Sequence, residues 1–308
     1  MSVSHSGFRL ALASCAQFPS VYPDDVYFVS VLQRLGIEAT VCIWNDPAVD
    51  WTAFDAVLIR TVWDYFKHYA AFLAWLDRLD RLGIAAINDT RLLRWNSEKR
   101  YLLDIARAGV PIIPTRVAPA GQLPQLLQSL AQDELVIKPS VSGGAWHTLR
   151  GTPGTAAFEQ ALAQLPATLD FLVQPFVPEI ASNGEWSLLY FAGSYSHAVI
   201  KHPASGDYRV QEEHGGSAVQ ATPDAGVLQA ADQALAAVAA LGYCEQTYAR
   251  VDGVVIGEQF HIMELELVEP MLHLAIRPDA AERFAAQVVA RLQGLHGKTA
   301  SAAEGSAP

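Results

Sequence analysis

The sequence predicts an α/β protein of two or three subdomains, with a small α+β lid between two larger units. Three observations lead to this prediction. The chain has 308 residues, of which 51% are hydrophobic and 17% charged, so it can bury more apolar surface than one domain usually carries. Its first part alternates strand patterns with helix patterns. Its last part contains pairs of strand patterns separated by helical stretches.

The N-terminal region, which we assign to residues 1–90, alternates apolar runs with amphipathic stretches. Strands are expected at 8–15, 38–43 and 56–60, and helices at 24–35 and 70–82. Gly36 and Gly83 each follow a helical stretch, as glycines that end helices commonly do. This order is typical of a small domain with a parallel sheet.

Residues 91–178 are expected to form a connector helix followed by the lid. The helix has Ser97 near its start, and Gly109-Val110-Pro111 ends it because proline cannot continue a helix. The lid is expected to have strands at 134–138 and 171–174 and a helix at 156–164.

Residues 179–296 are expected to form the C-terminal body. Strands are expected at 186–191, 195–201, 245–256 and 259–268, and helices at 225–241 and 278–295. The tail at 297–308 is small and polar, so we expect it to be disordered.

Composition excludes several classes of function. The formal net charge of -11 argues against a nucleic-acid partner, which needs basic surface. Cys15, Cys42 and Cys244 lie far apart without a C-x-x-C spacing, so neither a disulfide framework nor a zinc site is indicated. We find neither a signal-peptide pattern before Cys15 nor an apolar run of membrane-spanning length. We therefore expect a cytoplasmic protein that acts on a small ligand.

The most informative segment is the last pair of predicted strands. Alternation in Met263-Glu264-Leu265-Glu266-Leu267 places both glutamates on one strand face. If the chain turns back with Glu258 at the centre of the hairpin, Asp252 faces the first glutamate and Arg250 the second. Like charges facing each other across a sheet are unfavourable, so the three carboxylates require a cation, and an all-oxygen site suits Mg²⁺. An exposed acidic face, partly neutralised by Arg250, is the alternative.

Two other segments could bind a nucleotide. Lys138 ends an apolar strand before the small residues 140–145, and such a loop can surround phosphate oxygens with N–H groups. A plain strand-to-turn junction gives the same pattern. Gln174-Pro175-Phe176-Val177 leads from a strand into an extended segment that can offer main-chain groups to an adenine edge. A hinge between subdomains is the alternative.

Together these motifs resemble the ATP-grasp superfamily, over residues 88–295. Lys99 in a helix, Lys138 before a glycine loop, the hinge at Gln174, and Asp252 with Glu264-x-Glu266 follow that superfamily's order and approximate spacing. Most ATP-grasp ligases have asparagine where this chain has Glu266, which keeps an oxygen ligand but adds negative charge. The resemblance implies an ATP-grasp fold preceded by a substrate-binding α/β domain.

The resemblance also implies roles for individual residues. The residues implied to contact ATP are Lys99, Lys138, Ser142, Gly143, Gly144, Gln174, Phe176, Val177, and Glu179 or Glu185. Asp252, Glu264 and Glu266 would hold one or two Mg²⁺ ions, for which Mn²⁺ could substitute. Lys201, Arg209 and Arg250 would be the cations near the γ-phosphate, although solvated surface charges would give the same pattern.

The segments Arg60-Thr61-Val62-Trp63-Asp64-Tyr65 and Glu264-Leu265-Glu266-Leu267-Val268-Glu269-Pro270 are similar to the subgroup that includes O-ureido-serine cyclo-ligase. Arg60 ends a strand where α/β sheets commonly bind ligands and could hold a carboxylate in bidentate fashion; a structural corner is the alternative. The other expected substrate contacts are Trp63, Asp64, Tyr65, His214, Glu269 and His273.

The activity that the resemblance implies is ATP-dependent formation of a C–N bond. The γ-phosphoryl group moves to a substrate carboxylate, and a nitrogen then attacks the acyl phosphate, from the same molecule in a cyclo-ligase or from a second amine. A small-molecule kinase and a nucleotide-binding regulatory protein remain as alternatives. Because related enzymes are often dimers, the resemblance is compatible with a homodimer.

Overall fold

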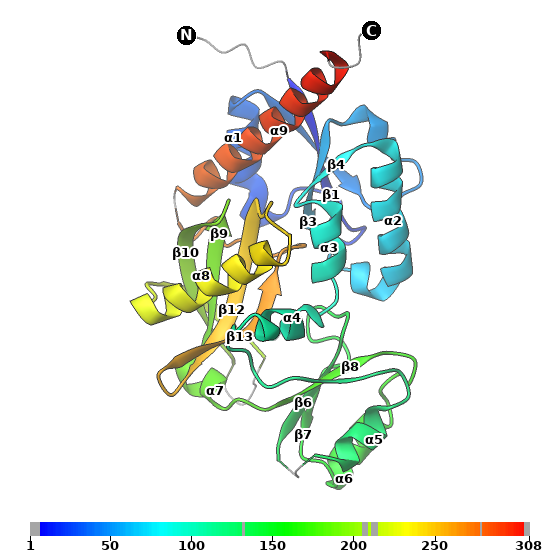
Figure 1. Cartoon of the computed structure of the whole chain (residues 1–308), viewed down its shortest axis with the longest axis vertical. Coiled ribbons are helices and arrows are strands. Elements are labelled where there is room, and N and C mark those ends of the chain that lie inside the picture. Colours follow the sequence, from blue (N-terminus) through cyan, green and yellow to red (C-terminus); the bar gives the residue numbers. More distant parts are fainter. Residues whose placement is uncertain (1–6, 131–132, 205–208, 211–214, 278, 305–308) are drawn as a thin grey trace.

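The computed structural model describes residues 7–130, 133–204, 209–210, 215–277 and 279–304. The described residues form three sheets that follow one another along the long axis of the molecule (Figure 1). The N-terminal sheet and the last helix lie at one end, the body sheet in the middle, and the lid sheet at the other end. This mixed α/β architecture is the predicted one.

The N-terminal sheet is parallel, as predicted, with strand order β2-β1-β3-β4. Its strands are β1 (Phe8–Ser14), β2 (Ile37–Ile43), β3 (Ala56–Thr61) and β4 (Ala85–Ile87). Its helical elements are α1 (Val26–Arg34), α2 (Tyr69–Leu82) and the 3-10 turns η1 (Pro23–Asp25), η2 (Trp51–Ala53) and η3 (Tyr65–His68). The sequence did not predict β4, because three residues are too short for an alternating pattern.

Two helices stand where one connector helix was predicted. They are α3 (Thr90–Asn96), whose N-cap Asp89 accepts from Leu92 N at 2.8 Å, and α4 (Tyr101–Arg107). Ser97 ends α3 instead of starting a helix. Lys99 therefore lies in the turn between the two helices, and its prediction as a helical residue is wrong.

The lid has an antiparallel sheet of order β5-β8-β6-β7, covered by two helices. Its elements are β5 (Arg116–Ala118), α5 (Leu123–Gln128), β6 (Leu135–Pro139), β7 (Leu149–Gly151), α6 (Ala156–Leu162) and β8 (Phe171–Pro175). Ile137, Phe158 and Phe171 form the centre of its small apolar core.

The body sheet is antiparallel, with order β11-β10-β9-β12-β13. Its elements are α7 (Glu179–Asn183), β9 (Glu185–Phe191), β10 (Ser194–His202), β11 (Ser217–Ala221), α8 (Ala225–Ala240), β12 (Tyr248–Ile256) and β13 (Gln259–Glu266). Asn88 joins this sheet to the N-terminal unit, since its side-chain amide donates to Tyr248 O at 3.0 Å and Leu267 O at 2.9 Å.

The last helix, α9 (Ala280–Glu304), packs against the N-terminal sheet and α1. Phe284 stacks on Phe28 at 4.5 Å between ring centroids and on Phe191 of β9 at 5.1 Å. The helix runs past Leu295, through most of the tail that we expected to be disordered; residues 305–308 lie outside the described part.

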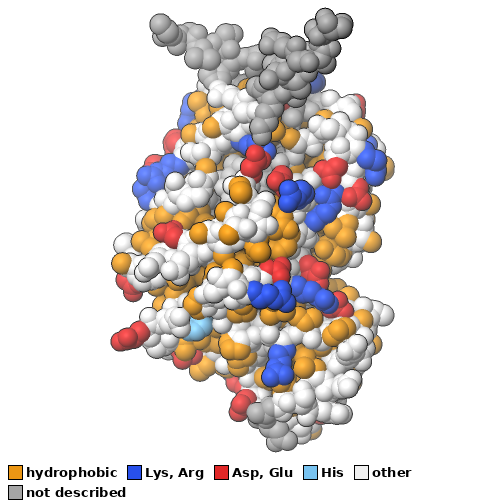
Figure 2. Space-filling model, in the orientation of Figure 1, with side chains coloured by type: hydrophobic (Ala, Val, Ile, Leu, Met, Phe, Trp, Pro, Cys, Tyr) orange, Lys and Arg blue, Asp and Glu red, His pale blue; other side chains and the backbone are white. Residues whose placement is uncertain are grey.

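On the face drawn in Figure 2, basic side chains lie beside acidic ones instead of merging into a continuous basic area. Within the described ranges, the structure has no helix that combines the length and apolar character needed to cross a membrane.

Candidate active site

Two adjoining cavities lie where the three units meet. Cavity I, of about 230 Å³, lies between the lid strands β6 and β8 and the body strands β12 and β13. Cavity II, of about 550 Å³, lies between the body and the aromatic residues that follow β1 and β3. The two cavities share the lining residues Gly143, Gly144, Lys201, Val210, Arg250, Glu266 and Glu269. The shared residues mark a junction between two compartments.

The floor of the junction is the β12–β13 hairpin. The predicted pairs are confirmed: Asp252 faces Glu264, and Arg250 faces Glu266. The hairpin turns at Gly257-Glu258, and a bulge leaves Met263 without a cross-strand partner, which restores the predicted register. Gly253 is required beside this bulge, because a Cβ there would lie 2.5 Å from the carbonyl oxygen of His261.

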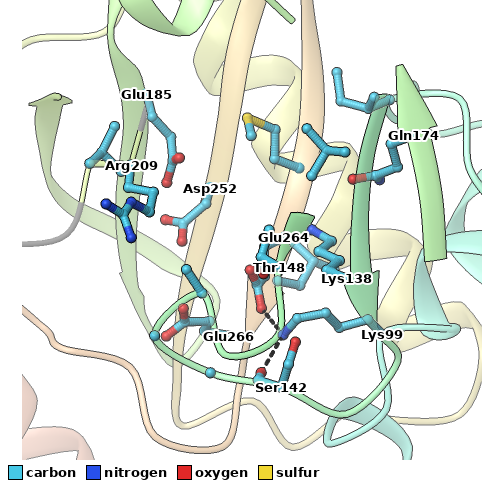
Figure 3. A pocket seen from close by; sticks show the side chains of 18 of the residues that line it. Lys99, Lys138, Ser142, Thr148, Gln174, Glu185, Arg209, Asp252, Glu264 and Glu266 are labelled. Carbon is cyan, nitrogen blue, oxygen red and sulfur yellow. Dashed lines mark hydrogen bonds and ion pairs between the residues drawn. The ribbon is translucent and has the colours of Figure 1, made fainter. Parts of the chain in front are cut away.

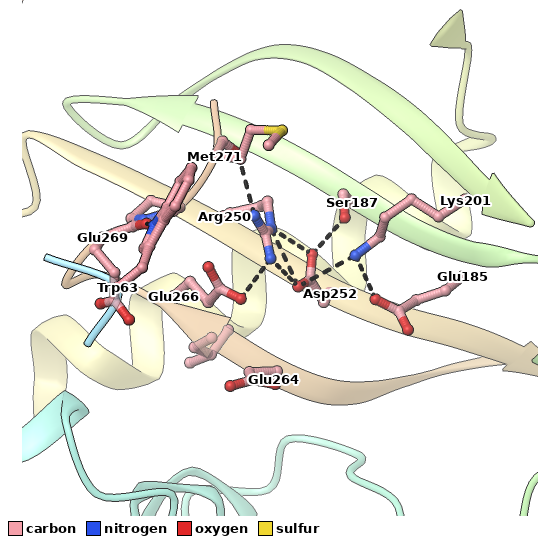
Figure 4. Close-up of polar contacts among 12 residues, drawn as sticks. Trp63, Glu185, Ser187, Lys201, Arg250, Asp252, Glu264, Glu266, Glu269 and Met271 are labelled. Carbon is pink, nitrogen blue, oxygen red and sulfur yellow. Dashed lines mark hydrogen bonds and ion pairs between the residues drawn. The ribbon is translucent and has the colours of Figure 1, made fainter. Parts of the chain in front are cut away.

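Cations neutralise the carboxylates of this floor (Figure 4). Arg250 donates from Nε and Nη2 to both oxygens of Asp252, each at 2.9 Å, and also binds Glu266. Lys201 binds Glu185 at 2.5 Å and approaches Asp252 at 3.7 Å. Ser187 donates to Asp252 at 2.5 Å. The floor is therefore an alternating array of charges on one face of the sheet.

The same array separates the pKa values of its carboxyl groups. Burial alone would raise the pKa of Asp252, but Arg250 and Lys201 hold it well below its usual range. Lys99 and Lys138 likewise overcome burial and lower the pKa of Glu264. Burial, followed by the charges of Asp252 and Glu264, raises the pKa of Glu266 to about 7 despite Arg250. Asp252 and Glu264 are thus held as carboxylates.

Two lysines lie over the floor in cavity I (Figure 3). Lys99 donates to the backbone oxygen of Ser142 at 2.9 Å and binds Glu264. The ammonium of Lys138, on β6, makes no hydrogen bond or ion pair with another described residue, and loss of water contact lowers its pKa. A half-buried ammonium without a bonded carboxylate is costly, so Lys138 is suited to an anionic ligand.

The glycine loop after β6 closes over both cavities and rests on the N-terminal unit. Gly143 lies so close to Phe66 that a Cβ added to Gly143 would be 2.8 Å from the Phe66 ring. The Phe66 ring also packs against Trp146, with 5.4 Å between the ring centroids. Gly144, Ala145 and His147 have positive φ angles of 54°, 57° and 51°. Such angles are strained for the two residues that are not glycine, so contacts around the loop hold its shape.

The far end of cavity I is apolar. Ile113, Val136, Phe176, Val177, Ile180 and Met263 line it. The hinge residue Gln174 also lines it and donates to Thr115 Oγ1 at 2.8 Å. A flat heteroaromatic ring fits such a space, with apolar side chains on its faces and polar groups at its edge.

The fit of the carboxylate floor to Mg²⁺ follows from its chemistry. Asp252, Glu264 and Glu266 present only oxygen donors from one face of the hairpin, which suits a hard cation. Across the described ranges, no three His, Cys, Asp or Glu side chains converge closely enough to hold a metal ion. Asp252, Glu264 and Glu266 are the residues that would hold a magnesium ion.

The structure brings most of the predicted site residues together. Those that line cavity I are Lys99, Lys138, Ser142, Gly143, Gly144, Gln174, Phe176, Val177, Glu185, Lys201, Arg209, Arg250, Asp252, Glu264 and Glu266. Of the predicted substrate contacts, Tyr65 lines cavity I, Trp63 and His273 line cavity II, and Glu269 lines both.

Three predicted residues lie elsewhere. Arg60 is buried and makes a bidentate ion pair with Asp25 at 2.9 and 3.0 Å, so it is not available to a substrate carboxylate. Asp64 accepts from Trp44 Nε1 at 2.7 Å and lines neither cavity. Glu179 starts α7 and also lines neither cavity, whereas Glu185 does line cavity I. His214 lies outside the described residues.

Sequence reasoning missed most of the wall of cavity II. The missed lining residues include Phe18, Tyr22, Phe66, Lys67, Trp146 and Met271. Phe66 directly follows the predicted Arg60–Tyr65 segment and could have been included. Lys67 follows Phe66 in the same turn, and the others come from three separate segments that no single pattern links.

The N-terminal unit matches a known family. Residues 10–88 match the model of the N-terminal domain of D-cycloserine synthetase DcsG. The cycloserine biosynthesis protein DcsG of Streptomyces lavendulae is 33% identical over 298 residues, which cover 92% of this chain and 99% of that protein.

Solved structures extend the comparison. A crystal structure of D-cycloserine synthetase DcsG superposes with a TM-score of 0.82 at 32% identity, over 92% of this chain and 99% of that chain. D-alanine–D-alanine ligase from Bacillus anthracis, solved with ATP, superposes with a TM-score of 0.63 at 13% identity, over 95% of this chain and 100% of that chain. The second likeness concerns the fold alone.

Proposed function

Because the chain belongs to the D-cycloserine synthetase family of ATP-grasp ligases, we propose that it is a Mg²⁺-dependent cyclo-ligase that acts on a small amino acid. The ligase uses ATP to activate the amino acid's carboxylate, which then forms an amide with a nitrogen of the same molecule. The resemblance to O-ureido-serine cyclo-ligase, together with the relative's role in cycloserine biosynthesis, makes O-ureido-D-serine the first substrate to test. Its ring closure would give a ring that still carries the carbamoyl group on nitrogen, and hydrolysis of that group to carbon dioxide and ammonia would leave cycloserine.

The observation that carries this proposal is the junction of the two cavities. ATP in cavity I and an amino acid in cavity II would meet at the shared residues Gly143, Lys201, Arg250 and Glu266. Phosphoryl transfer depends on holding donor and acceptor in line and on neutralising the charge that moves between them. A row of cations and glycine N–H groups between two compartments is suited to both tasks.

Different residues of the chain would bind different parts of ATP. The apolar end of cavity I would hold the adenine against Val136 and Met263, and the ammonium of Lys138 would contact phosphate oxygens. Lys99 would keep the glycine loop over the phosphates through its bond to Ser142 O. Lys201, Arg209 and Arg250 would stabilise negative charge on the transferring group.

Asp252, Glu264 and Glu266 would hold one or two Mg²⁺ ions, for which Mn²⁺ could substitute. When bound, the metal would neutralise phosphate charge during transfer.

The reaction would have two steps. A carboxylate oxygen of the substrate attacks the γ-phosphorus, which gives an acyl phosphate and ADP. The substrate's own nitrogen then attacks the acyl carbon, loses a proton and releases phosphate. Since both reacting groups belong to one molecule, their alignment within cavity II would supply much of the rate enhancement.

The experiment measures ADP and phosphate release with O-ureido-serine enantiomers and a panel of small amino acids, with product mass determined in parallel. The cyclo-ligase predicts one phosphate per ADP and a ring amide. ADP without phosphate and a stable phosphorylated product would identify a kinase. Turnover only when a separate amine is added would identify an intermolecular ligase. ATP binding without turnover for any compound would contradict the enzymatic proposal.

A further inference from the structure

Glu269 differs from the other carboxylates at the junction. It follows β13, is half-buried and lines both cavities. Asp252, Glu264 and Glu266 each have a cation partner. The carboxylate of Glu269 makes no hydrogen bond or ion pair with any residue in the described part of the chain.

The two cations whose charges act on Glu269, Lys99 and Arg250, are already bound to other groups. Lys99 binds Glu264 and the loop, and Arg250 binds Asp252, Glu266 and the backbone oxygen of Met271 at 3.1 Å. His273, which also lines cavity II, is buried beside Arg250 and Lys201, and this lowers its pKa to about 3. It is therefore neutral at physiological pH and provides no positive charge.

The position of Glu269 is nevertheless fixed through its backbone. Trp63 Nε1 donates to Glu269 O at 3.0 Å, and the Trp63 ring packs edge-on against Phe18 and Tyr22 at 5.1 and 4.8 Å. Figure 4 shows Trp63 beside Glu269, at the opposite end of the drawn cluster from Lys201. The aromatic wall of cavity II thus holds this residue in place while its carboxylate lacks a partner.

The surrounding charge indicates which ligand group would satisfy that carboxylate. Burial and the neighbouring Glu266 and Glu264 raise the pKa of Glu269 well above its usual range. Lys99 and Arg250 oppose this rise but are bound to other carboxylates, so a further cation is favoured over a neutral donor beside Glu269. In an amino acid, the α-ammonium lies next to the carboxylate that is to be phosphorylated, so it must also lie near the junction.

We propose that Glu269 binds the α-ammonium of the amino-acid substrate and thereby selects α-amino acids over acids that lack this group. The inference rests on the proposed function.

The experiment measures ligand binding by calorimetry in the presence of Mg²⁺ and a non-hydrolysable ATP analogue. The two probes are O-ureido-D-serine and 3-(ureidooxy)propanoate, which differ only in the α-amino group. They are titrated into the wild-type protein, Glu269→Gln and Glu258→Gln. The last variant removes the same charge from an exposed turn outside both cavities.

We expect the wild-type protein and Glu258→Gln to bind the amino compound about tenfold or more tightly than its analogue, as a charged hydrogen bond allows. Glu269→Gln should lose this preference and bind the analogue as the wild type does. Its thermal unfolding temperature should not fall, since the substitution removes no internal bond.

Two results would overturn the assignment of Glu269. One is that Glu269→Gln binds both probes more weakly by the same factor, which would indicate a structural role or a contact with the attacking nitrogen. The other is an unchanged preference in that variant. Either result leaves the ligase proposal standing if ADP, phosphate and ring amide are still formed. Failure of both probes to bind the wild-type protein would refute the substrate class and this inference with it.

Discussion

Lys138 and Lys99 illustrate how neighbouring cations can have different functions. Lys99 is paired inside the protein with Glu264 and the loop, whereas Lys138 has no partner among the described residues. An internal pair offsets the desolvation of both charges, while an unpaired ammonium gains most from an external anion. We therefore expect Lys138 to contribute more than Lys99 to the affinity for an anionic ligand.

Replacing Lys138 by alanine should weaken ATP binding about tenfold to a hundredfold, because it removes an ammonium directed at phosphate. Calorimetric titration with an ATP analogue measures this loss. Arg107→Ala is the control, since that side chain is 73% exposed and lies outside both cavities. Equal affinities in all three proteins would exclude Lys138 from the nucleotide site.

Replacing Glu264 by glutamine should lower Mg²⁺-dependent turnover by a factor of about a hundred or more, since it removes a charged metal ligand. Turnover is followed by phosphate release across a magnesium titration. Circular dichroism should show the fold retained. Near-normal turnover at every magnesium concentration would contradict the proposed metal site.

Asp252 links the charges of the site to stability. Its pKa is lowered in the folded protein, so its ionised form contributes stability above the unfolded pKa of 3.8, and this contribution is lost as pH falls through the folded value. Asp252→Asn should therefore cost about 3 kcal/mol of unfolding free energy at pH 7. The difference from wild type should shrink below pH 3. Denaturant titrations of both proteins at pH 7 and below pH 3 test this prediction. An equal difference in unfolding free energy at both pH values would contradict it.

At the scale of elements, the glycine loop is positioned by its contact with η3 as well as by its own sequence. Three positive φ angles within residues 144–147 give the loop a shape that needs support. Lys99 holds it through Ser142, and Phe66 packs where Gly143 has no side chain. The glycine loop and the N-terminal unit are thus in direct contact.

Gly143→Ala should displace the loop, because the new Cβ would lie 2.8 Å from the Phe66 ring. We expect kcat/KM to fall about tenfold or more, with turnover measured by ADP release. Adding Phe66→Ala should recover part of the loss by removing the clash. If the loss of kcat/KM in the double variant equals the product of the losses in the two single variants, the clash is not the cause.

At the scale of the whole molecule, α9 connects the chain's end to its beginning. Phe284 lies between Phe28 of α1 and Phe191 of β9, so one ring joins the N-terminal unit to the body. Hydrogen bonds join the same two units, because Asn88 donates to Tyr248 O and the Tyr248 hydroxyl donates to Ile87 O. We therefore expect these two units to unfold together.

Phe284→Ala should cost about 3 to 5 kcal/mol of unfolding free energy, as removal of a buried aromatic ring usually does. Denaturant unfolding followed by tryptophan fluorescence and by circular dichroism should give coincident transitions. Leu241→Ala is the control, because Leu241 is exposed, and this substitution should change the free energy of unfolding little. Separate transitions for the two probes would show that the N-terminal unit and the body unfold independently.

The homodimer suggested by the resemblance stays a prediction, which size-exclusion chromatography with light scattering can test.

Local patterns were enough to predict much of this protein. Alternating apolar runs predicted the parallel N-terminal sheet, and the spacing of Asp252, Glu264 and Glu266 predicted a shared strand face. Both features depend on the period of a strand and the reach of a hairpin, which neighbouring residues set. The order of the motifs then identified the family.

Tertiary structure decided what those patterns could not encode. It gave Arg60 a buried partner in Asp25 and brought Phe18 and Trp146 from distant loops to cavity II. It also left Glu269 without a cation partner among the described residues. It also packed α9 against the first sheet as well as against the body. In each case the outcome depends on which side chains meet across long sequence separations, and no local period determines that.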